Sequence, residues 1–407
     1  MTDIVITGLG ATTPLGADLE SSWSALLAGK SGARKIEQPW ADKLTTRIAA
    51  PFAVPPAQFL DRVKARRLDP SQQAAIVAAR EAWANAGTPQ VDPERLAVVI
   101  GTGVGGAVTL LAQHDILNEQ GQRRVSPHSI PMLMPNGPAA AVGLELCARA
   151  GVHTPISACA SGTESISVGA DLIRAGRADV VVVGGAEACI HPMPLAGFGQ
   201  ARALSTRNDD PTAASRPFDT GRDGFVMGDG AGVLVIERAD FAAARGATVI
   251  AKVAGAGISS DAYDMVAPEP TGAGARRAMT LALRDAGLAG SDVDHVNAHA
   301  TSTPMGDIVE AGAIRATIGD RATISATKSA TGHMLGATGA VECIFAVLAI
   351  RDQVSPFVLN LTDLDPNADI QALDIVRDSP RYSPIEVAIS NSFGFGGHNA
   401  SVLFTKA

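Results

Sequence analysis

"ISACASGTES", residues 156–165, is the stretch that decides the fold. An apolar residue leads into a turn of small residues, and the segment that follows Cys159 places Ile166, Ala170 and Ile173 at the spacing of one helix face. A strand that ends at this turn would bring the cysteine to the N-terminal end of the helix. The sequence therefore predicts a strand–turn–helix unit with a thiol at its junction.

A related pattern lies further along the chain. "ISATKSATG", which begins at Ile324, also puts a strand end before a small-residue turn and an alanine-rich helix. We interpret this echo as a sign of two related halves, residues 1–245 and 246–407, that share one core. No linker rich in proline, glycine or serine divides the chain.

Short β-branched runs alternate with alanine-rich segments throughout. Examples are "IVITGLG", "LAVVIGTGVGG", "DVVVVGGAE", "AGVLVIE", "HVNAHAT" and "VAISNSFGFGG". Continuous apolar strands between amphipathic helices are typical of a mostly parallel sheet that is buried on both faces. The pattern therefore predicts an α/β fold.

Composition excludes several classes of protein. The chain has 407 residues, is 46% hydrophobic and carries a formal net charge of -8. This size allows a large core, and the negative charge argues against nucleic-acid binding through the overall field. The apolar runs are shorter than the roughly 20 residues that cross a bilayer. The start "MTDIVITGLG" lacks the basic region of a secretory signal, so we expect a cytoplasmic protein with no membrane partner.

The four cysteines form no framework of disulfides or metal ligands. They are scattered, with no C-x-x-C pair and no zinc-ligand spacing, so we expect no metal site. Cys147, Cys189 and Cys343 lie inside apolar patterns and are interpreted as small buried hydrophobes, as most free cysteines are. Cys159 stands at a predicted helix N-terminus, where unpaired N–H groups favour the thiolate and lower the pKa.

The glycine-rich stretch "GTGVGG", residues 101–106, matches a dinucleotide-binding pattern. The segment behind it leads to no second strand with an acidic residue about 20 positions on, which ribose binding requires. The chain also lacks a P-loop motif and the G-x-S-x-G elbow of serine hydrolases. We therefore expect no nucleotide cofactor.

Two histidines occupy places like that of Cys159. His299 follows the strand-like run in "HVNAHATSTP", and His333 lies in "TKSATGHMLGATGAVE" between Lys328 and Glu342. One histidine alone is more often structural. Two of them with a cysteine, at three strand–helix junctions, fit covalent acyl chemistry, in which the thiolate is acylated and the imidazoles donate hydrogen bonds or protons.

The last motif is "NSFGFGGHN", residues 391–399. Its glycines allow the backbone to approach a ligand and a loop to change conformation. A phenylalanine between them would be a movable stopper. The alternative is a tight turn between the last two strands.

These motifs give the chain a family resemblance over essentially its whole length. It resembles the β-ketoacyl-acyl-carrier-protein synthases, most closely their type II members, through "SACASG", "VNAHATSTPMGD", "TKSATGHMLGATGAVE", "NSFGFGG" and the block "ALSTRNDDPTAASRPFDTGRDGFVMGDGAG". The resemblance implies the thiolase fold, a duplicated five-layer αβαβα sandwich, usually in a homodimer. It also implies an acyltransferase of fatty acid biosynthesis. Such an enzyme condenses acyl-carrier with malonyl-carrier, releases carbon dioxide, and works through an acyl-Cys159 intermediate without a cofactor.

The resemblance further implies roles for individual residues. The two histidines would assist decarboxylation and stabilise the enolate, and a lysine–glutamate pair would order the site. The implied catalytic residues are Cys159, His299, His333, Lys328 and Glu342. The implied oxyanion hole and gate comprise Cys159, Phe395 and Phe393.

Binding residues follow from the same resemblance. The pantetheine arm and the acyl pocket would involve Thr301, Thr303, Val104 and Met134. The acidic carrier protein would dock on basic residues, which as charged clusters are also typical of a solvated surface. They are Lys64, Arg66, Arg67, Arg123, Arg124 and Arg202.

Two positions depart from the family's common pattern, and three functions stay open at this point. Ala300 stands where glycine is common, and His398 stands where threonine is frequent. The open functions are fatty-acid elongation, a ketosynthase of a type II polyketide pathway, and a non-catalytic carrier-binding dimer partner. The presence of Cys159 and both histidines opposes the last. A thiolase would need a second catalytic cysteine near the C-terminus, where this chain has none after Cys343.

Overall fold

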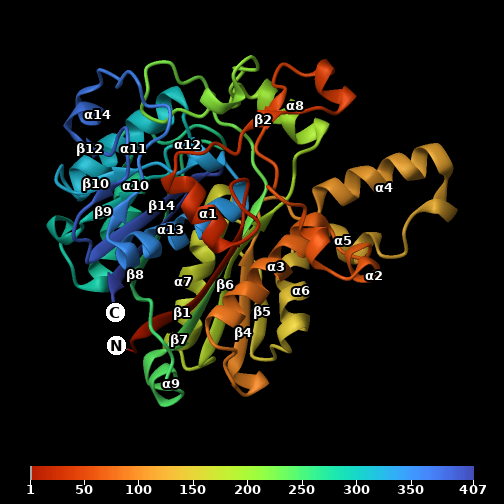
Figure 1. Cartoon of the computed structure of the whole chain (residues 1–407), viewed down its shortest axis with the longest axis horizontal. Coiled ribbons are helices and arrows are strands. Elements are labelled where there is room, and N and C mark those ends of the chain that lie inside the picture. The colour runs from red at the N-terminus through yellow and green to blue at the C-terminus, as the bar shows by residue number, and fades with distance from the viewer. Residues whose placement is uncertain (1) are drawn as a thin grey trace.

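The computed structural model describes residues 2–407, and its main feature is one hydrogen-bonded sheet of eleven strands (Figure 1). In spatial order the strands are β12 (Asp374–Ile375), β10 (Thr323–Ser325), β9 (His295–Asn297), β14 (Val387–Gly394), β15 (His398–Lys406), β8 (Ala251–Ser260), β1 (Ile4–Thr12), β7 (Gly230–Arg238), β6 (Val180–Glu187), β4 (Leu96–Gly101) and β5 (Gly151–His153). Two short pairs lie outside it: β2 (Arg34–Lys35) with β3 (Ile48–Ala49), and β11 (Val354–Ser355) with β13 (Arg381–Tyr382).

The two halves of this sheet repeat one topology. Outward from the antiparallel junction of β1 and β8, the strands run β1-β7-β6-β4-β5 on one side and β8-β15-β14-β9-β10 on the other. On each side the first two pairs are antiparallel and the next two are parallel. The echo at residues 156 and 324 is therefore matched by the topology, while the division at 245/246 stays a prediction.

The prediction of a mostly parallel sheet is wrong, because the sheet is mixed. The long central strands β7, β1, β8 and β15 form antiparallel pairs. β1 and β7 lie under helices on both faces, so they are buried along almost their whole length and look like parallel strands, whereas buried and half-buried residues alternate along most of β8.

Helices arrange the sheet into five layers, as the resemblance implied. Helix α3 (Pro70–Asn85) packs on β1, β6 and β7, and α10 (Ala273–Ala286) packs on β8 and β15. Between the two halves of the sheet lie α7 (Ser161–Arg174), against β4 and β6, and α13 (Thr338–Asp352), against β7, β9 and β14. The further helices are α1 (Leu19–Leu27), α2 (Arg62–Ala65), α4 (Ala107–Gln120), α5 (Ser129–Leu133), α6 (Gly137–Leu146), α8 (Pro192–Gln200), α9 (Ala239–Ala244), α11 (Pro304–Thr317), α12 (Lys328–Thr331) and α14 (Ala368–Ala372).

The central layer explains the burial of α13. Every residue from Thr338 to Ile350 is buried, because the helix is enclosed by sheet on two sides and by α7. A helix buried all round has no polar stripe. This layer brings the N-terminal ends of α7 and α13 together, and these ends carry the motifs at 156–165 and 324–342.

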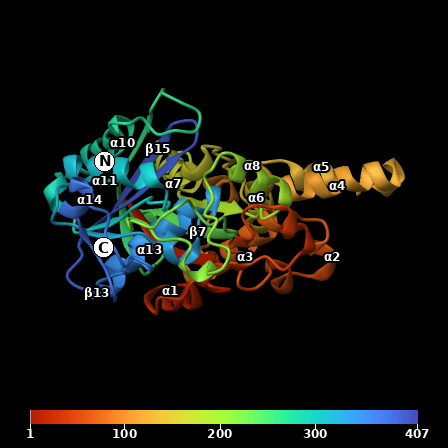
Figure 2. The ribbon, with the colours of Figure 1, turned by 90° about the horizontal axis from the view of Figure 1, so that it is seen from above.

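Helix α4 extends away from the sheet. Figure 2 shows it with α5 at one end of the molecule. The short turn η4 (Gln122–Arg124) follows α4 and carries the exposed Arg123 and Arg124. Within residues 2–407, none of the helices combines the length and apolar character needed to cross a bilayer.

Candidate active site

Cys159 lies in a strained turn at the start of α7. The turn η5 spans Ala158–Ala160, and Ala158 has a φ of +50°, a left-handed conformation that is unfavourable for a residue with a Cβ atom. Gly394, at the end of β14, packs directly on this turn. A Cβ atom there would lie 2.7 Å from the Ser157 carbonyl oxygen and 3.0 Å from the Cys159 nitrogen. The last strand hairpin therefore approaches the cysteine backbone closely.

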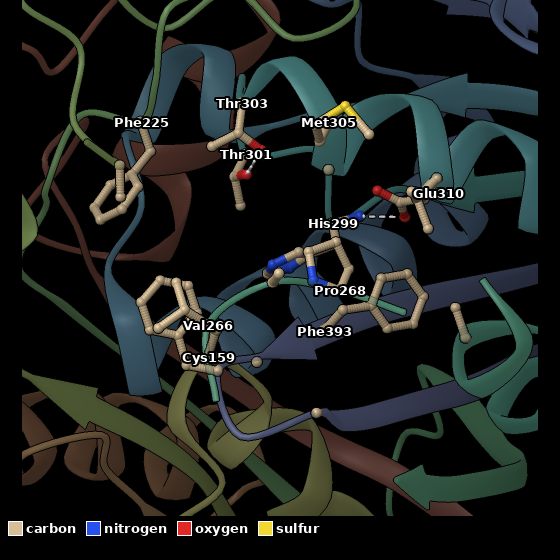
Figure 3. A pocket seen from close by; sticks show the side chains of 18 of the residues that line it. Cys159, Phe225, Val266, Pro268, His299, Thr301, Thr303, Met305, Glu310 and Phe393 are labelled. Atoms are coloured by element: carbon tan, nitrogen blue, oxygen red, sulfur yellow. Dashed lines mark hydrogen bonds between the residues drawn. The ribbon is translucent and has the colours of Figure 1, made fainter. Parts of the chain in front are cut away.

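Both predicted histidines reach the cysteine. The Sγ atom of Cys159 lies 3.0 Å from Nε2 of His333. The rings of His299 and His333 are 5.6 Å apart and nearly perpendicular, at 87°. The sulfur and one nitrogen of each ring lie within 4.8 Å of one another. Side chains from three distant segments thus meet at one point, and Figure 3 labels two of them, Cys159 and His299.

Hydrogen bonds to the other nitrogen of His333 define its tautomer. Nδ1 accepts the backbone N–H of Leu335 at 3.3 Å and lies 3.0 Å from the Thr338 hydroxyl. A backbone N–H can only donate, so we assign the ring proton to Nε2. His333 therefore directs an N–H donor at the Cys159 sulfur.

The pKa of the thiol differs from the sequence-based expectation. Burial raises the pKa of Cys159 to about 11, against the opposing effects of the Lys328 charge and the Phe395 backbone N–H. Enclosure of the sulfur thus outweighs its position at a helix N-terminus. The prediction of a lowered pKa is wrong for the resting protein, in which the thiol is protonated.

Both imidazoles are neutral. Burial, together with the positive charge of Lys328, lowers the pKa of His299 and of His333 well below the ordinary value. Nδ1 of His299 is buried and has no hydrogen-bond partner among the described residues. Neutral rings can donate to a developing anion without themselves being acids at neutral pH.

A buried ion pair lies behind the histidines. The Nζ atom of Lys328 lies 2.8 Å and 2.7 Å from the two carboxylate oxygens of Glu342, and the Thr327 hydroxyl also donates to this carboxylate, at 3.1 Å. Both charged side chains are 1% exposed or less. Burial raises the pKa of Glu342 to about 7 despite the lysine.

The cluster forms the floor of a cavity of about 390 Å³. The lining also includes Val266 and Pro268, from the loop before α10, and Met305, from the start of α11 (Figure 3). Thr301 and Thr303 line the cavity, and their hydroxyls lie 3.1 Å apart. A mainly apolar cavity lined by a thiol and two imidazoles suits a thioester substrate.

The loop predicted as a gate lies at the cysteine. Phe393 and Phe395 both line the cavity, and Phe393 packs edge-on against His299, with centroids 5.8 Å apart. The Phe395 ring lies 6.0 Å from that of Phe198. Gly396 and Gly397 have φ values of +85° and +73°, which glycine adopts without strain. His398, just beyond, is exposed at the start of β15.

Some predicted residues lie elsewhere. Val104 and Met134 do not line this cavity, and they are 43% and 38% exposed. They lie near the ends of β4 and α5, outside the wall built by the single chain. Their assignment to the acyl pocket stays a prediction.

The predicted docking residues are spread over three segments. Arg66 and Arg67 are exposed after α2, and Lys64 forms an ion pair with Glu145. Arg202, exposed after α8, lies at the cavity itself. The remaining two, Arg123 and Arg124, are exposed in η4.

Sequence reasoning missed the acid that holds His299 in place. Both oxygens of the buried Glu310 accept backbone N–H groups, from His299 at 2.7 Å and from Ala300 at 2.6 Å. Ala300 has a φ of +23°, at the edge of the region that favours glycine. An acid on α11, nearly two turns inside the helix that follows "HATSTP", was the available signal. Phe225 packs edge-on against His333, with ring centroids 5.2 Å apart, and no sequence pattern indicated this contact.

The donor set of the cluster also resembles a metal site, since cysteine and histidine bind zinc. A metal needs an unprotonated nitrogen, whereas we assign the proton of His333 to the nitrogen that faces Cys159. The arrangement therefore suits covalent chemistry better than metal binding.

Comparison with known proteins identifies the family. The family model described as "Beta-ketoacyl synthase, N-terminal domain" matches residues 1–242, and "Beta-ketoacyl synthase, C-terminal domain" matches residues 250–362. The chain belongs to the β-ketoacyl synthase family. Two curated relatives are named 3-oxoacyl-[acyl-carrier-protein] synthase 2. That of Mycobacterium tuberculosis is 48% identical, covering 99% of this chain and 97% of the relative. That of Staphylococcus aureus is 45% identical, covering 99% and 98%.

Solved β-ketoacyl synthases share the fold. A β-ketoacyl synthase from Burkholderia phymatum superposes with a TM-score of 0.92 at 37% identity, over the whole of both chains. A type II polyketide ketosynthase, solved in complex with its acyl-carrier protein, has a TM-score of 0.91 at 28% identity, covering 100% of this chain and 99% of that one. This β-ketoacyl synthase therefore has the thiolase fold expected from its sequence.

Proposed function

We propose that this β-ketoacyl synthase extends acyl chains on an acyl carrier protein, with Cys159 as the nucleophile. The protein is an acyltransferase that condenses acyl-carrier with malonyl-carrier in fatty acid elongation. The observation that carries the assignment of Cys159 is the 3.0 Å contact of its sulfur with His333 Nε2, at the floor of a cavity that His299 also lines.

The first step transfers the acyl group to the enzyme. The sulfur of Cys159 attacks the thioester carbonyl of acyl-carrier, and the carrier's thiol leaves with the proton that the cysteine loses. Since burial raises the pKa of Cys159, the thiolate has to be stabilised during attack. The N–H of His333, the charge of Lys328 and the Phe395 backbone N–H all favour the thiolate.

The second step makes the carbon nucleophile. Malonyl-carrier loses carbon dioxide, and the electrons of the broken bond form the enolate of its thioester. No strong base is needed, because the departure of carbon dioxide generates the carbanion. Neutral His299 and His333 would donate hydrogen bonds to the enolate oxygen, the form of stabilisation with the largest effect in such sites.

The third step forms the carbon–carbon bond. The enolate carbon attacks the acyl-Cys159 carbonyl, and the tetrahedral intermediate expels the Cys159 thiolate and releases β-ketoacyl-carrier. We assign the oxyanion hole to the backbone N–H groups of Cys159 and Phe395, both of which favour the Cys159 thiolate over the thiol. One such donor can lower the barrier by about 3 kcal/mol.

Lys328 and Glu342 would act from behind the reacting groups. Burial, with the lysine charge as a smaller contribution, keeps the two imidazoles neutral, and the same charge favours the cysteine thiolate. Glu342 keeps that lysine paired in a dry environment.

Thr301, Thr303 and the aromatic gate would handle the substrate arm. The two threonine hydroxyls line the cavity and would donate to or accept from the amides of the pantetheine arm. Movement of Phe395 between its flexible glycines would open space beyond Cys159 for the acyl chain, with Phe393 beside it.

The basic residues on α2, η4 and α8 would dock the acidic carrier. Arg202 at the cavity entrance would stand closest to the arm, and the five other basic side chains would steer the approach in a salt-dependent way.

We also propose a homodimer. The outermost strand of the N-terminal half, β5, has a free edge, and apolar side chains near it are exposed: Val152 at 42%, Leu144 at 82% and Ile156 at 53%. A second copy would cover this apolar surface and the edge. Val104 and Met134 could then join the acyl pocket at the interface. A cytoplasmic location remains a prediction from the sequence.

An assay of purified protein tests the function. With malonyl-carrier and an acyl-carrier series, the wild type should release carbon dioxide and form β-ketoacyl-carrier, and Cys159→Ala should form none. Activity with coenzyme A thioesters alone, or full activity of Cys159→Ala, would contradict the proposal.

A further inference from the structure

Glu187 is a buried acid that the proposed chemistry does not use. It ends strand β6 and is 0% exposed. Burial raises the pKa of its carboxyl to about 7, against four hydrogen bonds that favour the charged form. A carboxylate in such a place has a structural or functional reason to be there.

Its hydrogen bonds explain the glycine-rich stretch at residues 101–106. One carboxylate oxygen accepts the Thr102 hydroxyl at 3.0 Å and the Val104 N–H at 3.3 Å. The other accepts the Gly103 N–H at 2.6 Å and the Gly336 N–H at 3.1 Å. All four donors are uncharged. The pattern that resembled a phosphate-binding loop therefore binds an anion that belongs to the protein itself.

Close backbone contact makes this arrangement specific to glycine. A Cβ atom on Gly103 would lie 2.6 Å from the Glu187 carboxylate, and one on Gly336 would lie 2.3 Å from the Gly103 nitrogen. The loop after β4 and the turn η8 (Leu335–Ala337) thus touch each other through their backbones, with the carboxylate binding both.

The turn η8 is also what orients His333. Leu335 donates its N–H to His333 Nδ1, and the next residue, Gly336, donates its N–H to Glu187. Leu335 itself has a φ of +46°, a strained conformation that persists only where neighbours hold it. The contact between Gly336 and Glu187 is one such restraint.

We infer that Glu187 is a positioning residue: by binding the loop 102–104 and Gly336 together, its carboxylate holds the turn that aims His333 Nε2–H at the Cys159 sulfur. The inference rests on the proposed roles of Cys159 and His333. Glu187 touches neither the cavity nor a reacting atom, so its effect passes through His333.

The charge of Glu187 also acts directly on Cys159, and this effect disfavours the thiolate, whereas the orientation of His333 favours it. Its negative charge helps to raise the pKa of the thiol. Glu187→Gln removes this charge, which favours the thiolate, but it also places an amide N–H₂ against backbone donors and loosens the turn at Gly336. A double-mutant cycle separates the two effects, because only the second requires His333.

The experiment measures the rate at which iodoacetamide alkylates Cys159, read by peptide mass spectrometry. Cys147 is exposed, so its interpretation as a buried hydrophobe is wrong: it ends α6 at the surface, whereas Cys189 and Cys343 are buried as expected. Its exposure makes Cys147 an internal reference for the reagent and for folding. The rate ratio of Glu187→Gln to its parent is measured with His333 present and in a His333→Ala background. We expect the ratio with His333 present to be lower by roughly fivefold or more. Equal ratios in the two backgrounds would overturn the inference.

Asp229→Asn is the matched control. Asp229 is another buried acid near Glu187 with a pKa raised by burial to about 7, but it binds the backbone of Cys189 and Ile190 and not η8. Its two rate ratios should be equal. If Glu187→Gln does not fold, Gly103→Ala displaces the carboxylate without removing the charge, and it should slow alkylation only when His333 is present.

The alkylation cycle needs no carrier protein, so it is independent of the proposed reaction. Coupling between Glu187 and His333 in a protein that fails to condense acyl- and malonyl-carrier would leave the inference standing and reject the function. If the wild type condenses the substrates but Glu187 and His333 are not coupled, the proposed function stands and the inference about Glu187 is rejected.

Discussion

Replacement of Glu342 by leucine should lower the free energy of unfolding by more than the small change in side-chain volume would suggest. Lys328 and Glu342 are buried together, and both carboxylate oxygens bind the lysine Nζ, at 2.8 Å and 2.7 Å. Without the glutamate, an ammonium group stays in the protein interior with no anion beside it. Removal of one partner of such a pair destabilises proteins by about 3–5 kcal/mol.

The double variant Lys328→Met/Glu342→Leu should recover most of that loss. Apolar side chains of similar volume remove the desolvation cost of both charges, so stability should return to within about 1 kcal/mol of the wild type or exceed it. Condensation should stay impaired in both variants, because the charge that favours the Cys159 thiolate is absent or misplaced.

Urea denaturation followed by circular dichroism measures these differences, and a condensation assay on the folded variants measures activity. If the single and double variants lose the same stability, the pair is not coupled as its distances indicate. If the double variant keeps full activity, the lysine charge has no role in the chemistry.

Three further predictions concern the site and the buried acids. His333→Ala should keep part of the self-acylation of Cys159 and lose condensation by about 100-fold or more, since a donor to the enolate is removed; rates by carbon dioxide release that match the wild type would contradict its role. Gly394→Ala should slow acylation of Cys159 by about tenfold or more, because its Cβ atom would lie 3.0 Å from the Cys159 nitrogen; an unchanged acylation rate by stopped-flow would show that the turn tolerates displacement. The free energy of unfolding of Asp229→Asn, relative to that of the wild type, should rise by about 2 kcal/mol between about pH 5 and pH 7. Burial raises the folded pKa of Asp229 to about 7, so the wild type loses this contribution as pH rises, whereas the asparagine does not titrate and keeps both backbone N–H groups on one oxygen. Parallel stability curves for the two proteins would refute that assignment.

The duplicated architecture could be predicted because each half leaves the same trace, a strand end followed by small residues and a helix. The direction of the central strands could not. Strands such as β1 and β7 lie in the middle of the molecule under helices on both faces, and burial alone then decides their sequence.

The site could be predicted in part, through residue types at the strand–helix junctions. Cys159 and His299 do lie between a strand and a helix, whereas His333 lies between α12 and α13. The N-terminal ends of α7 and α13 share the central layer, which brings Cys159 and His333 together with His299 beside them. The pKa of Cys159 could not be predicted, since it depends on how completely the surrounding loops enclose the sulfur. Glu187 was missed because its glycine-rich partner loop was compared only with loops that bind external phosphate.

The most direct test of the account is the mass of the enzyme after incubation with acyl-carrier alone. The account predicts one added acyl group, mapped by peptide analysis to Cys159 and absent from Cys159→Ala. An acyl group on Cys147, Cys189 or Cys343, or no added mass while β-ketoacyl product still forms with malonyl-carrier, would contradict it.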